Sequence, residues 1–237
     1  MTTATLSCRH LTVRYEAGSA PVLDGVTFEV APGERVALLG LNGSGKTSLL
    51  MATVGLVPHS GTLEVCGIAV SRESLAKVRD RVGFLFNVPE DQLLFPRVLD
   101  DVAFALLRRG VPVPEASTRA STVLASLGIG HLAEQSLHHL SHGQQQRVAL
   151  AGALISEPPL LLLDEPSAAL DPPGKHQLAK LLQGQSAAML VATHDLDFAR
   201  RFCTRFLMLD MGGVVFDGTD TSQIVQRWEL GDGTHLP

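Results

Sequence analysis

Short apolar segments bounded by turn residues recur along the chain, and their spacing predicts strands and helices. Near the N-terminus, Leu11–Tyr15 and Val26–Val30 predict strands of an antiparallel layer, joined by a loop at Glu16–Asp24. The wholly apolar run Val36–Leu39 ends in glycine, which is typical of a buried parallel strand. Residues 46–56 then carry a helical pattern. This part of the chain therefore predicts an antiparallel layer followed by entry into a parallel sheet.

The pattern changes to helices between about Leu99 and Glu157, where no segment has a convincing strand pattern. The expected helices there are Val102–Arg108, Glu115–Leu127 and Gln144–Ser156. Further strands are expected at Thr62–Cys66, Val82–Phe86, Leu160–Leu163, Met189–Thr193 and Phe206–Leu209, and a hairpin turn at Gly212-Gly213. Strands that alternate with helical patterns indicate a mostly parallel sheet with crossover helices.

These elements predict one α/β domain. We expect its core at about residues 1–86 and 158–237, and a helical subdomain at about 95–157. The composition agrees with a folded domain, because 45% of the residues are hydrophobic and 18% are charged, which excludes disorder and coiled coils.

The formal charge of −5 argues against binding to nucleic acid through phosphate contacts. The three cysteines are far apart and predict reduced structural thiols. The N-terminal residues lack a signal-peptide pattern, and no apolar run reaches the ~18 residues that a membrane span needs. We therefore expect a cytoplasmic protein that reaches the membrane only through partners.

A glycine-rich loop of the pattern GxxxxGK[ST] lies between the predicted strand Val36–Leu39 and the following helix. Its glycines allow backbone N–H groups to approach phosphate oxygens, and the helix points its positive end at the same anion. Lys46 is expected between the β- and γ-phosphates, and the Thr47 hydroxyl on Mg²⁺. This context disfavours an incidental glycine turn. The predicted nucleotide-binding residues here are Gly40, Leu41, Asn42, Gly43, Ser44, Gly45, Lys46, Thr47 and Ser48.

Two acidic residues and a histidine follow apolar strands further along the chain. Asp164 and Glu165 end the run Leu160–Leu163, where an α/β sheet presents catalytic groups. We expect Asp164 to hold Mg²⁺ through its water shell and Glu165 to polarise the attacking water. His194 ends the strand Met189–Thr193, where it can reach the γ-phosphate, although a structural role is equally open.

Together these motifs resemble those of the ATP-binding cassette (ABC) ATPases over nearly the whole chain. Residues 140–147 read LSHGQQQR and resemble the LSGGQ-x-QR signature of this family. Residues 167–171 match its D-loop, and His194 matches its switch histidine. Tyr15 matches the aromatic residue that stacks on adenine, with an ordinary strand aromatic as the alternative. The resemblance implies a P-loop ATPase with ATP and Mg²⁺ as ligands.

The family also implies a head-to-tail dimer with a second ABC ATPase subunit, identical or different. Ser141 can cap a helix starting near Gln144, and the positive end of that helix is expected to face the γ-phosphate bound by the partner. The resemblance therefore places Ser141, Gly143, Gln144 and the D-loop Asp171 on nucleotide. Closing and opening of the dimer would drive integral membrane subunits.

The chain departs from the family pattern at two positions. Asn87 stands where the family has a Mg²⁺-binding glutamine and, being shorter, predicts weaker or water-mediated ligation. Gln92 is an alternative ligand. His142 replaces the first glycine of the signature. Both changes fit neutral variation, or a heterodimer with unequal sites.

Residues 89–93, 100–104 and 146–154 resemble the energy-coupling-factor importers of cobalt, nickel or vitamins. The apolar Leu93–Phe95 is a candidate dock for a membrane subunit, or part of the subdomain core. The cluster His131, His138, His139 and His142 has no matching Cys or acidic ligands, so we expect a solvated surface rather than a metal site.

The sequence thus predicts the ATP-hydrolysing subunit of an importer. Three alternatives stay open: the ATPase of another ABC transporter class, a soluble non-transport ABC ATPase, and a non-hydrolysing nucleotide sensor. DNA-repair ATPases of the family insert coiled coils between the phosphate loop and the signature, and this chain has no heptads there. Translation-factor types carry two cassettes per chain, and this chain has one.

Overall fold

A computed structural model of the protein describes residues 4–16 and 18–231. The strands are β1 (Leu6–Val13), β2 (Leu23–Val30), β3 (Arg35–Leu39), β4 (His59–Val65), β5 (Ile68–Ala69), β6 (Val82–Leu85), β7 (Leu160–Asp164), β8 (Ala188–Ala192), β9 (Arg205–Asp210) and β10 (Gly213–Gly218). The α-helices are α1 (Lys46–Thr53), α2 (Leu75–Arg79), α3 (Val98–Leu107), α4 (Val113–Ser126), α5 (His142–Leu154), α6 (Pro172–Gln183), α7 (Leu196–Arg200) and α8 (Ser222–Gly231).

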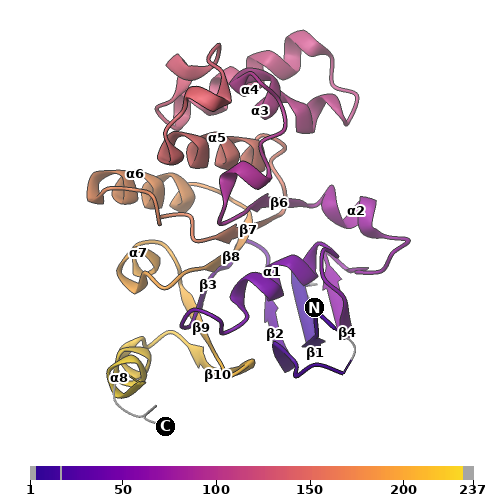
Figure 1. The fold of residues 1–237 in the computed structure, drawn as a ribbon, viewed down its shortest axis with the longest axis vertical. Helices are drawn as coiled ribbons and strands as arrows, with labels where there is room; N and C mark the ends of the chain where they lie inside the picture. Colours follow the sequence, from indigo (N-terminus) through magenta and orange to yellow (C-terminus); the bar gives the residue numbers. More distant parts are fainter. Residues whose placement is uncertain (1–3, 17, 232–237) are drawn as a thin grey trace.

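Two sheets form the lower and middle parts of the molecule as drawn in Figure 1. Within the described residues, one sheet is antiparallel, with strand order β2-β1-β4-β5. The other has the order β10-β9-β3-β8-β7-β6, parallel except for β10, which pairs antiparallel with β9. The predicted fold class, an antiparallel layer beside a mostly parallel sheet, is confirmed.

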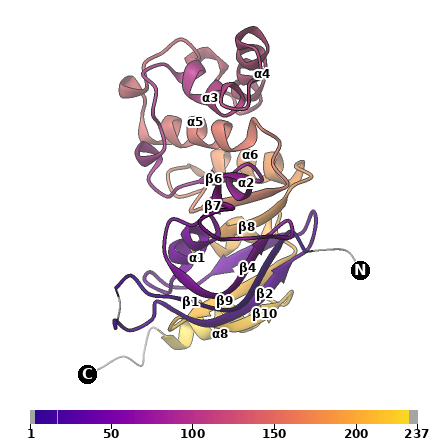
Figure 2. The same ribbon diagram turned by 90° about the vertical axis from the view of Figure 1, so that its right-hand side faces the viewer.

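Helix α1 packs between the two sheets, while α6, α7 and α8 lie along the other face of the parallel sheet (Figures 1 and 2). Successive side chains of β3 alternate between these two cores, because strand residues point to opposite faces. Val36 and Leu38 join the core that contains α1, and Ala37 and Leu39 join the opposite one. Both faces of β3 are therefore covered, which explains its unbroken apolar sequence.

Helices α3, α4 and α5 gather at the other end of the molecule, around an apolar cluster of their own (Figure 1). Val102 of α3, Leu124 of α4 and Val148 of α5 are buried in this cluster. Helix α5 also contributes Leu150 and Leu154 to the core of the parallel sheet. It therefore joins the helical cluster to the sheet. Among the described residues, no helix has both the length and the apolar character that a membrane crossing requires.

The structure shifts several predicted boundaries near the N-terminus. Strand β1 begins at Leu6, not at Leu11. An irregular register and a positive φ of 53° at His10 interrupt the alternation of side chains in this strand, so the sequence pattern showed only its second half. Strand β2 begins at Leu23, inside the predicted loop. The predicted hairpin at Gly212-Gly213 joins β9 to β10, and Gly212 has the positive φ of 79° that suits glycine.

Candidate functional site

The glycine-rich loop connects β3 to α1, and its backbone conformation depends on glycine. Gly45 directly precedes α1 with φ 99°, and a Cβ there would lie 2.6 Å from Leu23 Cδ2. A Cβ on Gly40 would lie 2.5 Å from the carbonyl oxygen of Leu209. No side chain caps the start of α1. The backbone N–H groups of this turn and the positive end of α1 can therefore receive an anion.

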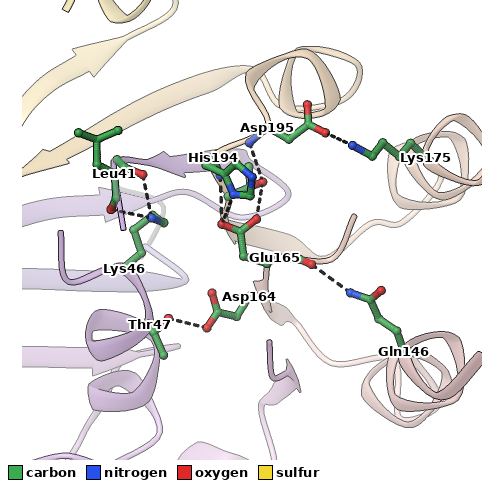
Figure 3. Close-up of polar contacts among 11 residues, drawn as sticks. Leu41, Lys46, Thr47, Gln146, Asp164, Glu165, Lys175, His194 and Asp195 are labelled. Carbon is green, nitrogen blue, oxygen red and sulfur yellow. Dashed lines mark hydrogen bonds and ion pairs between the residues drawn. The ribbon is translucent and has the colours of Figure 1, made fainter. Parts of the chain in front are cut away.

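Lys46 is the first residue of α1, and its side chain turns back over the loop (Figure 3). Its Nζ donates hydrogen bonds to the carbonyl oxygens of Gly40 at 2.8 Å and Leu41 at 3.1 Å. The residue is 7% exposed, and this burial lowers the pKa of the ammonium group. The negative charges of Glu165 and Asp164 raise the pKa, but they offset the effect of burial only in part. The loop therefore holds a cation where phosphate oxygens are expected.

Asp164 ends β7 beside the start of α1. Its Oδ2 accepts a hydrogen bond of 2.7 Å from the Thr47 hydroxyl, whereas Oδ1 is buried without a partner among the described residues (Figure 3). Burial raises the pKa of this carboxyl group, although the Thr47 hydrogen bond acts in the other direction. A buried carboxylate oxygen beside a hydroxyl is a suitable pair of donors for a hard cation. These residues fit Mg²⁺.

The Glu165 carboxylate is oriented by the end of the neighbouring strand β8. Its Oε2 accepts from the Thr193 hydroxyl at 2.9 Å, and its Oε1 accepts from the His194 N–H at 3.1 Å and lies 2.9 Å from His194 Nδ1. On the other side, Gln146 of α5 donates from Nε2 to the Glu165 carbonyl oxygen at 3.0 Å (Figure 3). Glu165 has φ 48°, so it sits on a sharp turn after β7. A fixed carboxylate of this kind can accept a proton from a bound water.

A cleft of about 360 Å³ joins these groups. Its lining contains most of the predicted phosphate-loop residues together with Asp164, Glu165 and Asn87. Asn87 therefore shares the cleft with Thr47 and Asp164, and its ligation of Mg²⁺ stays a prediction. The alternative ligand Gln92 does not line this cleft: its Oε1 accepts from the Phe86 N–H at 2.8 Å, and its Nε2 donates to the Ala149 carbonyl at 3.2 Å. Gln92 thus links the segment after β6 to α5 by hydrogen bonds. The prediction that Gln92 substitutes for Asn87 as a Mg²⁺ ligand is wrong.

Tyr15 lies just after the end of β1, near α1. Its hydroxyl is 2.9 Å from the Ser48 hydroxyl, and the residue is 55% exposed. A strand aromatic packed in the core is therefore excluded. The ring is left accessible beside the helix that follows the phosphate loop, so stacking on adenine stays a prediction.

The predicted signature residues lie outside this cleft. Ser141 caps α5, which begins at His142: Ser141 Oγ accepts from the Gln144 N–H at 3.4 Å, and Gln144 Oε1 accepts from the Ser141 N–H at 2.9 Å. Gly143 faces the D-loop, and a Cβ there would lie 3.2 Å from the Ala169 carbonyl oxygen. The expected cap is confirmed, and the start of α5 is a second possible anion site.

Asp171 also lies outside the cleft, and the structure gives it a local role. It caps α6 by accepting from the Gly174 N–H at 2.9 Å.

His142, which replaces the first glycine of the signature, contacts the segment after β6: its Nδ1 lies 3.3 Å from Glu90 Oε1. Because Glu90 follows shortly after Asn87, this contact connects the signature helix to the segment that lines the cleft.

Sequence reasoning missed two residues that orient Glu165. Thr193 precedes the predicted His194 and carries a buried hydroxyl directly after β8. Its place at the end of a strand beside β7 could have indicated a contact with Glu165. Gln146 lies inside the signature, but nothing in the sequence indicated that its amide contacts the Glu165 carbonyl. Both contacts depend on how β7, β8 and α5 pack.

Comparison with known proteins gives consistent matches. A sequence model of the family described as ABC transporter matches residues 23–168. A protein of Streptomyces coelicolor named as an ABC transporter ATP-binding protein is 42% identical over 216 residues, covering 91% of this chain and 83% of that protein. A protein of Gloeobacter violaceus with the same kind of name is 44% identical over 219 residues, covering 90% and 88%.

Solved structures match over most of the chain as well. CbiO1 of Clostridium perfringens, described as part of the ABC transporter complex cbiONQ, is 30% identical with a TM-score of 0.81, covering 97% of this chain and 94% of that one. A bacterial ABC transporter cassette solved as a dimer is 29% identical with a TM-score of 0.81, covering 90% and 98%. The same cassette has been solved with ADP and phosphate in a post-hydrolysis state.

Proposed function

The chain belongs to the ABC transporter family of ATP-binding proteins, and on that premise we propose that it drives an importer of the energy-coupling-factor type. Family membership makes the chain an ABC transporter ATPase subunit. The importer type is supported by the likeness to cbiO1 along almost the whole chain and by the resemblance of residues 89–93. The cargo we propose is a metal ion, cobalt or nickel, or a vitamin.

The observation that carries the ATPase activity is the single cleft shared by the phosphate loop, Asp164 and Glu165. Backbone N–H groups of the loop and Nζ of Lys46 bind the phosphates of ATP. Thr47, Asp164 and Asn87 would hold Mg²⁺, which when bound neutralises phosphate charge. Glu165, held by Thr193 and His194, accepts the proton of the attacking water.

We further propose that two such subunits, identical or different, pair head to tail around ATP. Ser141, Gly143, Gln144 and Asp171 do not line the cleft of their own chain, and the capped start of α5 is suited to an anion. A second copy can bring these groups onto the nucleotide of its partner. The dimeric form of the related bacterial cassette supports this arrangement.

The surface beside the segment 89–95 is our proposed dock for an integral membrane subunit, which would hold the protein at the cytoplasmic face of the membrane. Leu93 packs against the core of the parallel sheet and against the apolar cluster of α3, α4 and α5, whereas Leu94 is 70% exposed. Leu94 and Phe104 line one groove with Phe84 of β6. An apolar side chain from a membrane subunit can insert there.

Purification of the complex from membranes tests this function. A Glu165→Gln variant carrying an affinity tag is isolated in detergent with ATP, and its partners and tightly held solute are identified by mass spectrometry. We expect a second ABC ATPase subunit, membrane subunits and a metal ion or vitamin. Recovery of only soluble partners would point to a non-transport ATPase, and recovery of another solute class with its own transporter would exclude the energy-coupling-factor type. A Leu94→Asp variant is expected to lose the membrane subunits, whereas Val113→Asp, exposed on α4, serves as the matched control.

A further inference from the structure

A second cavity, of about 230 Å³, lies between α5 and α6, beside the end of α4 (Figure 1). Its walls are mostly leucine side chains, namely Leu85, Leu127, Leu150, Leu170, Leu178 and Leu181. This cavity shares none of its lining residues with the phosphate-loop cleft. It is therefore separate from the groups that we assign to ATP.

The polar side chains of the cavity wall are Ser126, Gln146, Arg147 and Gln177. Gln146 presents no polar atom to the cavity, because its Nε2 donates to the Glu165 carbonyl oxygen at 3.0 Å and its Oε1 has almost no accessible surface. Ser126 and Gln177 are exposed and mark the open side. No acidic residue lines the cavity in the described part of the chain. The charge of the wall is therefore the single positive charge of Arg147.

The guanidinium group of Arg147 lies at this wall, beside the start of α6. Its Nη2 is 3.4 Å from the point where a Cβ would stand on Gly174, which also lines the cavity. Asp171 Oδ1 lies 2.7 Å from the same point, but it accepts from the Gly174 N–H at 2.9 Å. Among residues 4–16 and 18–231, Arg147 forms no ion pair with Asp171 or any other acid, and its side chain donates no hydrogen bond. Its donors are therefore available to a ligand.

The charge and the lining together restrict the ligand. Arg147 is half-buried, and a charge withdrawn from water is costly unless an anion pairs with it. The planar fork of a guanidinium matches the two oxygens of a carboxylate. Leucine walls favour an apolar body. A dry apolar cavity of about 150 Å³ is already large enough for benzene, so a cavity of 230 Å³ can hold one ring with a carboxylate.

We propose that this cavity binds a small amphipathic carboxylate, an apolar ring or short chain whose carboxylate accepts hydrogen bonds from the Arg147 guanidinium. The apolar body packs against Leu150 of α5 and Leu178 of α6. Such a ligand also contacts Pro166, which directly follows Glu165 in the chain. The proposal does not depend on the transported cargo or on the importer type.

Benzoate and benzamide are suitable probes, because they have nearly the same shape and only benzoate carries a negative charge. Binding at neutral pH is followed through leucine methyl resonances of the full chain. We expect benzoate to shift the methyl signals of Leu150 and Leu178 and to bind about tenfold more tightly than benzamide, the ratio that one charge-assisted hydrogen bond supplies. Absence of such shifts up to the solubility limit of benzoate would overturn the proposal. Equal affinity for the two probes would also overturn it, since it would show that the guanidinium does not recognise the ligand.

Two variants locate the binding, each with a matched control. Arg147→Gln removes the charge and is expected to lower the affinity for benzoate to that for benzamide, whereas Arg72→Gln removes the same charge from an exposed position outside the cavity lining and should change neither. Leu181→Phe reduces the cavity from a half-buried wall position and is expected to weaken both probes, whereas Val113→Phe on the exposed start of α4 should leave both unchanged.

A preference for benzoate that persists in Arg147→Gln would refute the proposed contact. Binding that survives in Leu181→Phe would place the probes elsewhere and refute the proposed site. If Arg147→Gln fails to fold, the comparison of benzoate with benzamide on the unmodified chain and on Leu181→Phe decides.

Discussion

Replacing Glu165 by glutamine tests whether this carboxylate accepts the proton during hydrolysis. The change is nearly isosteric, and the surrounding hydrogen bonds can adapt to it. Glutamine Oε1 can still accept from the His194 N–H, and the new NH₂ group would face the Thr193 hydroxyl, which can accept as well as donate. We therefore expect the fold and the affinity for ATP to be preserved.

The rate of hydrolysis should fall strongly in this variant, because an amide cannot accept a proton from water. Removal of a general base costs roughly 10²–10⁴ in rate, equivalent to about 3–5 kcal/mol of transition-state stabilisation. Single-turnover release of phosphate, measured on protein saturated with ATP, reports this step without the contribution of binding. Calorimetry of ATP binding checks that affinity is unchanged.

Asp197→Asn is the matched control, since it removes the same charge a few residues from His194 on a side chain that is 88% exposed. We expect its turnover to equal that of the unmodified chain. A Glu165→Gln variant with turnover within a few-fold of normal would remove Glu165 from the mechanism. If both variants slowed equally, the effect would come from net charge.

Three further predictions address binding and stability. Tyr15→Ala should weaken ATP binding by about 1–3 kcal/mol if the ring stacks on adenine, whereas Tyr15→Phe, which loses only the contact with Ser48, should bind normally; equal calorimetric affinities for all three proteins would exclude stacking. Leu162→Ala, in the fully buried β7, should lower the free energy of unfolding in urea by about 2–5 kcal/mol, and the half-exposed Leu56→Ala by much less. Burial raises the pKa of Asp195, but the hydrogen bond from Lys175 and the one from the Phe198 N–H outweigh this and hold it below its usual value. A lowered pKa stabilises the fold above about pH 4 and loses this effect as pH falls, so Asp195→Asn should be less stable by about 1 kcal/mol at pH 7 and equally stable in acid; a constant difference in urea midpoints across pH would contradict this.

Local sequence patterns were sufficient for those parts of the protein whose signals are short in range. The run Val36–Leu39 predicted a strand covered on both faces, and β3 has one face in each core. The phosphate loop could be identified because glycine spacing, a lysine and a following helix are all encoded within a few residues. The Ser141 cap followed in the same way from the residues at the start of α5. In each case the local structure is determined by residues that are adjacent in the sequence.

Boundaries were less predictable where pairing with a distant strand decides them. Strand β1 extends back to Leu6 because it pairs with β2 on one side and β4 on the other, across an irregularity near His10 that breaks the alternation of side chains. The role of Gln92 was also beyond local reasoning. Its carboxamide has the right chemistry for a cation, but the packing of α5 against β6 directs it to backbone groups instead.

The sequence alone determined the chemical groups of this protein, namely a phosphate-binding loop, two carboxylates after a buried strand and a serine-capped helix, because each is encoded by adjacent residues. Only the tertiary structure decided which groups meet. Parallel pairing of β7 with β8 brings Thr193 and His194 onto Glu165, and the packing of α5 brings the Gln146 amide to the Glu165 carbonyl oxygen. Such contacts join residues far apart in the chain, and hydrogen-bond geometry between them depends on the packing of whole elements, which no local pattern contains.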